Sequence, residues 1–446
     1  MGYFAQRQIA LHVAYFGERY CGFASQELRE DTVEHHLFAA LSKACLISDR
    51  AGSGYSRCGR TDAGVSAMSQ IVTLKVRSQL RCPLPAESSI AATLVRPSKK
   101  KASGGVGGVG AAGAAGAAGA AGEGAPAGEE PVPLVSAEQP VGPDSDDALE
   151  LNYPALLNKL LPEDIMVLGW APCPSLDFKA RFNAESRTYR YYFLRRALDL
   201  DAMRRAGALL QGVHDYRNFC KMDVVNVHTY LREIRKVDVV EVDARLCFLR
   251  VEGTAFLWHQ VRCVAAVLFM VGRGQERPEV VTQLLDVEAH PRKPVYDIAA
   301  PLPLVLHDSD YADLAFRYDS RVLASLRERL DAVVAGHELR AGLARGILEF
   351  VVDHAPAVLS SAPGSASLAA PGPASGLRGA FAQQGLPLPE IAGDFAQSQK
   401  GKSNLISAEA HMPLLLRPLC DSYDTRVENL SDKKRETARR RHGRDL

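Results

Sequence analysis

The 446-residue sequence lacks the features that mark several large classes of protein. Its nine cysteines include no CxxC pair, which argues against a disulfide framework or a zinc ribbon and favours reduced thiols inside a cell. Basic and acidic residues almost balance, at a formal charge of +1, so the chain is no histone-like polycation. The longest apolar run, near Val264–Gly272, is much shorter than the roughly 18–20 residues of a membrane span. We therefore expect no membrane partner.

Motifs for metal and nucleotide chemistry are missing as well. The sequence contains no GxxxxGK[ST] phosphate loop, no HExxH pair and no HxE followed by PCxxC. These absences argue against a phosphate-binding NTPase, a zincin protease and a zinc deaminase, because each class depends on one of the missing motifs. We expect neither a metal nor a cofactor.

Composition divides the chain into five parts. Residues 98–148 are a Gly/Ala repeat that becomes acidic, and residues 355–402 are rich in Ala, Ser, Pro and Gly. Segments with so few bulky apolar residues cannot offset their ordering entropy, so we expect both to be inserted, disordered stretches. They separate a first α/β unit at residues 1–97 from a second at 149–354, and the latter from a basic tail at 403–446.

Periodicity predicts strands and helices within the two units. Ile9–Tyr15 alternates as a half-buried strand, and Asp31–Glu34 has the spacing of a capping box at a helix start. Arg187–Leu194 alternates with tyrosines on both faces, and a hairpin is expected around Asp243-Ala244. Ala255–Gly272 is expected to be a largely buried helix, and a second helical pattern runs over Asp319–His354.

The strongest local motif is Cys58–Ala67, which lies before a strand around Val72–Val76. Glycines in this motif let the backbone bend tightly. Arg60 and Asp62 are two residues apart, so in an extended loop they point the same way, and the guanidinium would keep the carboxylate ionised. An ordinary Asx turn with a surface ion pair explains the same residues equally well.

Two further motifs combine charge with aromatic rings. Between Phe178 and Tyr191, basic residues such as Arg181 alternate with rings such as Tyr189, a mixture that suits phosphates and bases; a sheet with core tyrosines is the alternative. In Phe256–Arg262, His259 and Arg262 are three residues apart on one helix face and can reach a shared cleft. A capping histidine and a solvated arginine are the alternative.

Taken in order, these motifs resemble the tRNA pseudouridine synthase family whose bacterial member is called TruA. The resemblance covers roughly residues 8–97 and 149–307, and the tail more loosely. It is carried by the motifs Gly59–Val65, Ala180–Phe182, Arg187–Tyr189 and Phe256–Arg262. Within the family the chain is similar to the eukaryotic branch that modifies tRNA positions 38 and 39; the supporting stretches are Gly22–Gln26, Gly64–Ala67, Asn218–Asp223 and Phe256–Arg262.

The resemblance implies a fold, an activity and site residues. The expected fold is α+β, with two α/β domains, each with an antiparallel sheet and helices on one face, and a basic active cleft between them. Asp62 would be the catalytic aspartate and Arg60 its partner, while Tyr189 would pack against the target base. Arg262, His259 and Arg181 would complete the substrate-binding surface. The reaction would convert uridine to pseudouridine in the anticodon stem-loop, which requires no cofactor because it involves no redox, hydrolytic or phosphoryl-transfer step.

The partner implied by the resemblance is the anticodon arm of tRNA, and bacterial members are homodimers. We expect the protein to be located in the nucleus or the cytoplasm. An organelle is equally compatible with reduced cysteines. A non-catalytic RNA-binding protein on the same scaffold is the main alternative. A methyltransferase is a second alternative, but no strand followed directly by a Gly-rich turn supports it.

Overall fold

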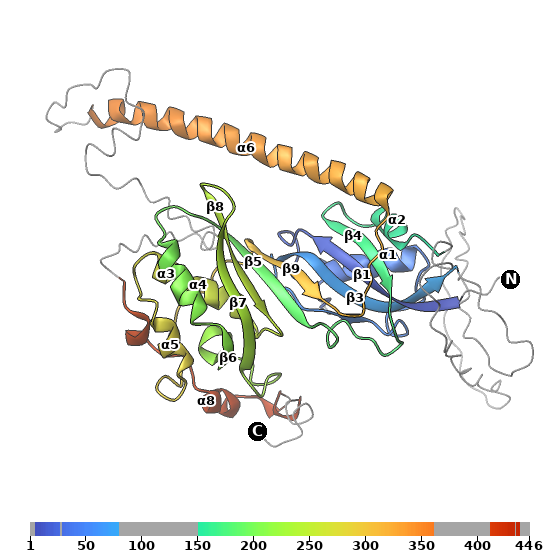
Figure 1. The fold of residues 1–446 in the computed structure, drawn as a ribbon, viewed down its shortest axis with the longest axis horizontal. Helices are drawn as coiled ribbons and strands as arrows, with labels where there is room; N and C mark the ends of the chain where they lie inside the picture. Colours follow the sequence, from blue (N-terminus) through green and yellow to red (C-terminus); the bar gives the residue numbers. More distant parts are fainter. Residues whose placement is uncertain (1–4, 27–28, 80–149, 361–410, 433, 438–446) are drawn as a thin grey trace, which may run out of the picture.

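A single mixed sheet of nine strands forms the centre of the protein (Figure 1). The computed structural model describes residues 5–26, 29–79, 150–360, 411–432 and 434–437. The sheet order is β4-β1-β3-β9-β5-β8-β7-β6, and β2 pairs with β3. The strands are β1 (Ala5–Tyr15), β2 (Ser56–Arg57), β3 (Ser66–Ser78), β4 (Ile165–Pro172), β5 (Ser186–Leu194), β6 (Gly212–Asp215), β7 (Leu231–Glu241), β8 (Leu246–Gly253) and β9 (Leu304–Asp310).

Helices pack against the sheet in two groups. One group packs on the β1–β3–β4 half, and the other packs on the β5–β8–β7 half. The helices are α1 (Val33–Lys43), α2 (Tyr153–Asn158), α3 (Leu200–Ala208), α4 (Gln260–Gly272), α5 (Val280–Leu285), α6 (Ser320–Ser360) and α8 (Tyr423–Glu428), with 3-10 turns at Arg217–Phe219 and Leu414–Leu416. No helix within the described ranges combines the length and apolarity needed to cross a bilayer.

The strand predicted at Ile9–Tyr15 is present, but both of its faces are buried. Ile9 and Leu11 face the core under α1 and α2, as the alternation predicts. Ala10 is fully buried on the opposite face, in a cluster with Cys58 and Ala180. Small residues on this second face let a loop pack directly onto the sheet, which the polarity pattern alone did not indicate.

Helix α1 begins where the sequence predicts, but not with the predicted capping pair. Thr32 is the N-cap, and its hydroxyl accepts a hydrogen bond from the His35 amide at 3.4 Å. Glu34 turns inward instead and is completely buried. It accepts from the Arg50 guanidinium at 2.5 Å and from Arg57, at the end of β2. Burial raises the pKa of Glu34, but the Ser25 amide and the charge of Arg57 outweigh this and lower it overall.

The second half of the sheet contains the predicted β5 strand and the β7–β8 hairpin. The helix expected over Ala255–Gly272 is shorter: α4 begins only at Gln260. His259 is its N-cap and has a φ of 61°, in the left-handed region that a helix interior does not allow. The preceding residues therefore form a loop, which carries Trp258 outward.

Strand β9 joins the two halves into one sheet. It pairs with β5 in the antiparallel sense and with β3 in the parallel sense. Leu306 of β9 lies between Ala67 of β3 and Tyr189 of β5. The predicted α+β class is confirmed, with the two expected sheets fused edge to edge and one parallel pair at the junction.

The two cores do not follow the expected unit boundary at residue 149. Strand β4 lies in the expected 149–354 unit, yet it pairs with β1 at the far edge of the sheet. Helix α2 likewise packs in the core of the first half, where Tyr153 is fully buried. The first half is therefore built from two stretches of chain that flank the insertion at 98–148, and that insertion lies outside the described residues.

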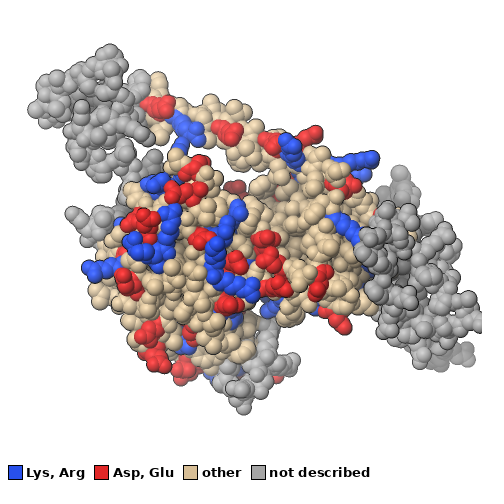
Figure 2. All heavy atoms as spheres, viewed as in Figure 1, with Lys and Arg blue, Asp and Glu red and all other residues tan. Residues whose placement is uncertain are grey.

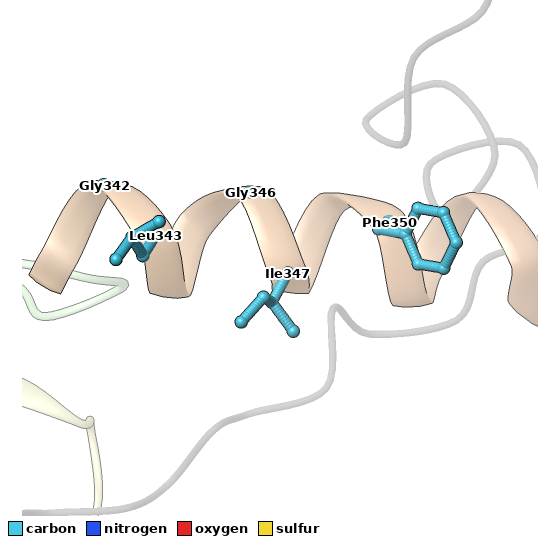
Figure 3. Close-up of a pocket in the computed structure, with 5 residues that line it drawn as sticks. All are labelled: Gly342, Leu343, Gly346, Ile347 and Phe350. Carbon is cyan, nitrogen blue, oxygen red and sulfur yellow. The ribbon is translucent and has the colours of Figure 1, made fainter.

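Helix α6 confirms the helical pattern at Asp319–His354 and continues to Ser360 (Figure 1). Near its start, Leu326 packs against Ala14 and Met166. Farther along, the helix extends beyond the sheet and its apolar side chains are exposed, among them Leu339. Leu343, Ile347 and Phe350, which are also exposed, are drawn in Figure 3. The first residues of the expected 355–402 insertion belong to the end of α6, and the remainder lies outside the described residues.

Part of the expected basic tail at 403–446 packs against the second half. Leu414 is fully buried in the core beneath α4. His411 Nε2 lies 3.0 Å from the partly buried Glu276 carboxylate, and the Arg292 Nε donates to the Cys420 carbonyl at 2.9 Å. This segment is thus part of the folded protein, because its apolar residues contribute to the core.

Candidate active site

The loop that carries Asp62 connects β2 to β3 and is held from below by the end of β1. The Tyr15 hydroxyl and the Thr61 hydroxyl are 2.7 Å apart, and both residues are buried. Gly17 approaches so closely that a Cβ there would lie 2.0 Å from the Val65 carbonyl oxygen. The backbone at Gly17 therefore requires glycine, which explains why this residue follows the β1 strand.

A tight turn fixes the direction of Asp62 itself. The Val65 amide donates to the Asp62 carbonyl at 3.1 Å, and Gly64 between them has a φ of 79°. At the start of the loop, the buried Gln70 side chain donates to the Gly59 carbonyl at 2.9 Å and accepts from its amide. Both ends of the loop are thus hydrogen-bonded to the protein, which limits the movement of the carboxylate.

Arg187, at the start of β5, ties this loop to two others. Its guanidinium donates to the carbonyls of Cys58 at 3.2 Å, Arg181 at 2.7 Å and Thr254 at 2.6 Å. The side chain is largely buried, so these bonds replace the water that the charge loses. A planar guanidinium has the geometry to serve three carbonyls at once, which an ammonium group lacks.

The Asp62 carboxylate meets groups from the opposite half of the sheet. His259 Nε2 lies 3.3 Å and Arg262 Nη1 lies 3.8 Å from the same oxygen, Oδ2. Trp258 adds a side-chain hydrogen bond to the carboxylate. The Arg262 Nε in turn donates to the Ala299 carbonyl at 2.6 Å, which fixes the guanidinium. The site therefore forms only because the β5–β8–β7 half faces the Asp62 loop.

Burial dominates the electrostatics of Asp62. Desolvation raises the pKa of its carboxyl above the ordinary value, while the Arg262 charge, the Trp258 hydrogen bond and the Lys221 charge act in the opposite direction. The carboxyl remains about one quarter exposed, so a ligand can reach it. A partly desolvated carboxylate is more reactive than one in water, because fewer water molecules must be removed before it reacts.

His259 acts at this site as a neutral ring. Burial and the charges of Arg262, Lys221 and Lys293 lower the pKa of His259 to about 4. At neutral pH the ring is therefore uncharged, and its 3.3 Å contact with Asp62 Oδ2 is not an ion pair. Within the described residues, the other ring nitrogen, Nδ1, is buried without a hydrogen-bond partner.

Arg262 is the cation with the largest effect on the pKa of Asp62, and the pairing of Arg60 with Asp62 stays a prediction. Among the charges that lower the pKa of Asp62, Arg262 has the largest effect. Arg60 lies on the Asp62 loop with an exposed side chain. The i,i+3 spacing of His259 and Arg262 predicts a shared cleft, and both side chains approach the same Asp62 oxygen.

Tyr189 lies one strand away from the Asp62 loop, across Leu306 of β9. Its ring packs edge to face against Phe256, with 5.1 Å between the centroids. Burial is the main cause that raises the pKa of Tyr189, and the charge of Asp62 adds to it. The ring is therefore close to the carboxylate, half-buried and uncharged at neutral pH.

Arg181 is exposed at the edge of the site. Its guanidinium lies 5.5 Å from the ring centroid of Phe182, which is 77% exposed. The backbone of Arg181 is held to the Asp62 loop through Arg187. The sequence motifs predicted a role for Arg181 but not for Trp258 or Arg187. Trp258 and Arg187 occur in the quoted motifs, but a local pattern does not show which atoms their side chains reach.

Charged side chains on the outer face of β7 and β8 are distributed differently from those around Asp62. Figure 2 shows acidic and basic side chains interspersed over the face that β7 and β8 present. Ion pairs account for this pattern, for example Lys236 with Asp238 at 3.2 Å and Arg204 with Glu241 at 2.9 Å. Near Asp62, by contrast, Lys221 and Arg262 act on both the carboxylate and His259, and Lys293 acts on His259 as well.

Fold and site together define an α+β protein whose centre is a desolvated aspartate, set on a loop of one half-sheet and balanced by an arginine from the other. A family model described as tRNA pseudouridine synthase matches residues 206–312. A tRNA pseudouridine synthase A from Archaeoglobus fulgidus is 34% identical over 185 residues, which cover 42% of this chain and 68% of that protein. The chain belongs to the tRNA pseudouridine synthase family.

Eukaryotic relatives match a larger part of the chain. The tRNA pseudouridine(38/39) synthase of Bos taurus is 36% identical over 77% of this chain, and that of Saccharomyces cerevisiae is 31% identical over 76%. The chain spans 64% of the length of the cattle protein and 65% of that of the yeast protein.

Replacing Arg187 should loosen the Asp62 loop. We expect Arg187→Lys to lower the free energy of unfolding by about 2 kcal/mol, because at least one buried carbonyl loses its donor. Hydrogen exchange should accelerate at residues 58–65, 181–183 and 254–258. Arg190→Lys on the same strand is the control, because Arg190 packs on Phe248, 4.5 Å from its centroid, rather than on these carbonyls. Equal exchange in both variants would contradict the role of Arg187.

Proposed function

We propose that this protein is a tRNA pseudouridine synthase that converts uridine to pseudouridine in the anticodon stem-loop, at positions 38 and 39. The observation that carries the proposal is the Asp62 carboxylate, desolvated yet balanced by Arg262 at 3.8 Å. The names of the cattle and yeast relatives, both tRNA pseudouridine(38/39) synthases, support the choice of positions.

The reaction is an isomerisation that a carboxylate can catalyse without a cofactor. The N1–C1′ bond breaks and a C5–C1′ bond forms; the proton lost at C5 is balanced by the one gained at N1. Asp62 acts as nucleophile or base in the step that frees the uracil ring. Arg262 keeps it ionised despite its burial. Trp258 donates a hydrogen bond and the neutral His259 ring contacts Oδ2 at 3.3 Å, so both orient the carboxylate without adding charge.

The target uridine must leave its stack to reach Asp62, at a cost of a few kcal/mol. Tyr189 is proposed to offset this cost by packing its half-buried ring against the extruded base. Arg60 and Arg181 are exposed on two loops that Arg187 holds together, and they are proposed to contact phosphates near the target. The substrate in this proposal is tRNA, recognised at its anticodon arm.

The compartment proposed for this activity is the nucleus or the cytoplasm. The basic run near the end of the sequence, which includes Lys434 and Arg439–Arg441, is of the kind that import receptors bind.

A non-catalytic RNA-binding protein on the same scaffold is the alternative, and Asp62 separates the two. We expect Asp62→Asn to keep the fold and bind the anticodon stem-loop, but to lose pseudouridine formation by more than about a thousandfold, because the amide is neither nucleophile nor base. A single-turnover assay on the stem-loop measures this loss. Asp201→Asn, at a carboxylate that is 78% exposed on α3, is the control. Activity within tenfold of the parent would remove Asp62 from the chemistry.

The pH dependence of the reaction should report on Arg262. Only ionised Asp62 is active, so the rate should fall as the pH drops through its pKa, which burial raises above the ordinary carboxyl value. Because Arg262 lowers this pKa, Arg262→Gln should shift the acidic limb of the rate profile to higher pH. Arg262→Lys keeps the charge and should leave the limb near its original position. A limb that does not move in Arg262→Gln would show that another group controls it.

We also propose that two copies of the chain pair through α6. Gly342 and Gly346 form a shallow hollow beside Leu343, Ile347 and Phe350 on one face of the helix (Figure 3). The same patch thus offers protruding and recessed surfaces, so an antiparallel second copy can fill it symmetrically.

Charges on this patch should therefore separate the copies. We expect Leu343→Glu combined with Ile347→Glu to convert a dimer into a monomer, because two carboxylates from each copy would be buried at the interface. Light scattering during gel filtration gives the mass. Arg345→Glu, on the other side of α6, is the matched control. A parent chain that remains monomeric at high concentration would refute the pairing.

A further inference from the structure

Trp258 and Lys221 form an aromatic and cationic pair beside Asp62 to which the proposed reaction assigns no binding role. The Trp258 side chain is 45% exposed, whereas the other tryptophan, Trp170, is buried. The Lys221 ammonium lies 4.2 Å from the centroid of the Trp258 ring. The Lys221 amide also donates to the Trp258 carbonyl at 2.9 Å, so the two residues are held together through backbone as well as side chain.

This pair is anchored to the reaction centre. The Trp258 side chain is hydrogen-bonded to Asp62, and the Lys221 charge acts on the same carboxylate. The next residue, His259, takes the left-handed φ of 61°, and its ring centroid lies 5.0 Å from that of the indole. This sparsely populated conformation of the backbone at His259 directs both rings toward the Asp62 loop. One edge of the indole is thus fixed at the carboxylate, while much of its remaining surface stays in solvent.

A ring of this size with a cation above it suits one unpaired nucleotide. The flat face of a base stacks on an indole, and its phosphate pairs with an ammonium group. When a uridine leaves its stack, the base next to it loses a stacking partner and needs a replacement. The indole is fixed at the carboxylate to which that uridine is delivered, so its exposed surface lies within reach of the neighbouring base.

We propose that Trp258 and Lys221 bind the nucleotide adjacent to the target uridine, with its base on the indole and its phosphate at Lys221 Nζ. The inference rests on the proposed function, because that function defines the target. It assigns to the site a second base-binding position, distinct from the Tyr189 ring on β5.

A coupling experiment with modified RNA tests the stacking contact. Stem-loops are made with a single abasic nucleotide on the 5′ or the 3′ side of the target uridine, and binding is measured by fluorescence anisotropy. We expect Trp258→Leu to bind the intact RNA about tenfold more weakly, since stacking on one ring contributes on this scale. With the parent protein, one of the two abasic RNAs should bind about tenfold more weakly than the intact RNA. With Trp258→Leu, the same abasic RNA and the intact RNA should bind equally well.

Phe182→Leu is the matched control, because Phe182 is also an exposed ring paired with a cation but lies on a different loop. Its effect should add to that of either abasic site, whereas the effect of Trp258→Leu should not add at one of them. Additive effects of Trp258→Leu at both flanking positions would overturn the proposal. Thermal unfolding of each variant checks that the fold is retained.

The phosphate contact is tested by salt dependence. Lys221→Gln should reduce the slope of log affinity against log salt concentration by about one, as expected for one lost phosphate contact, while Lys221→Arg keeps it. An unchanged slope in Lys221→Gln would refute the phosphate assignment. Pseudouridine formation is measured separately with the intact RNA. Absence of product would refute the proposed function and leave the binding data readable, whereas product with fully additive coupling would refute only this inference.

Discussion

A carboxylate that must stay ionised while it loses water is the constraint on which the rest of this structure depends. Burial raises the pKa of the Asp62 carboxyl, so the structure must supply positive charge close to it. The compensating charge comes from Arg262, on the other half of the sheet. A modest separation of the two halves would leave a partly buried charge without its partner, which is far more costly than losing an exposed ion pair.

The fused sheet meets this constraint. Two independent α/β units would meet across a mobile interface, whereas β9 hydrogen-bonds to β3 and β5 and makes the halves continuous. Arg187 strengthens the junction from within, since one guanidinium joins the backbones of three loops. Among the described strands, the one parallel pairing occurs at this junction, where strands from distant parts of the sequence must be brought side by side.

Local patterns in the sequence predicted the elements whose burial follows a simple period: β5, the β7–β8 hairpin, α1 and the helical stretch of α6. They did not predict β9, whose seven residues are defined by neighbours far away in sequence. The start of α4 was also missed, because apolar residues at 255–258 continue the helical pattern although His259 ends it. For the site, motifs identified Asp62, Tyr189 and Arg262, but choosing Arg262 over Arg60 as the stronger charge required the fold.

The cations of the site are divided by position, and this division has a physical consequence. Inside, Arg262 balances Asp62, while Trp258 supplies a hydrogen bond and His259 contacts the carboxylate as a neutral ring, so the pocket gains little net charge. A second buried cation would lower the basicity of the carboxylate and make it less reactive. Lys221 stays at the exposed rim, where a phosphate can meet it without entering the pocket. An RNA can therefore be attracted electrostatically without changing the ionisation on which Asp62 depends.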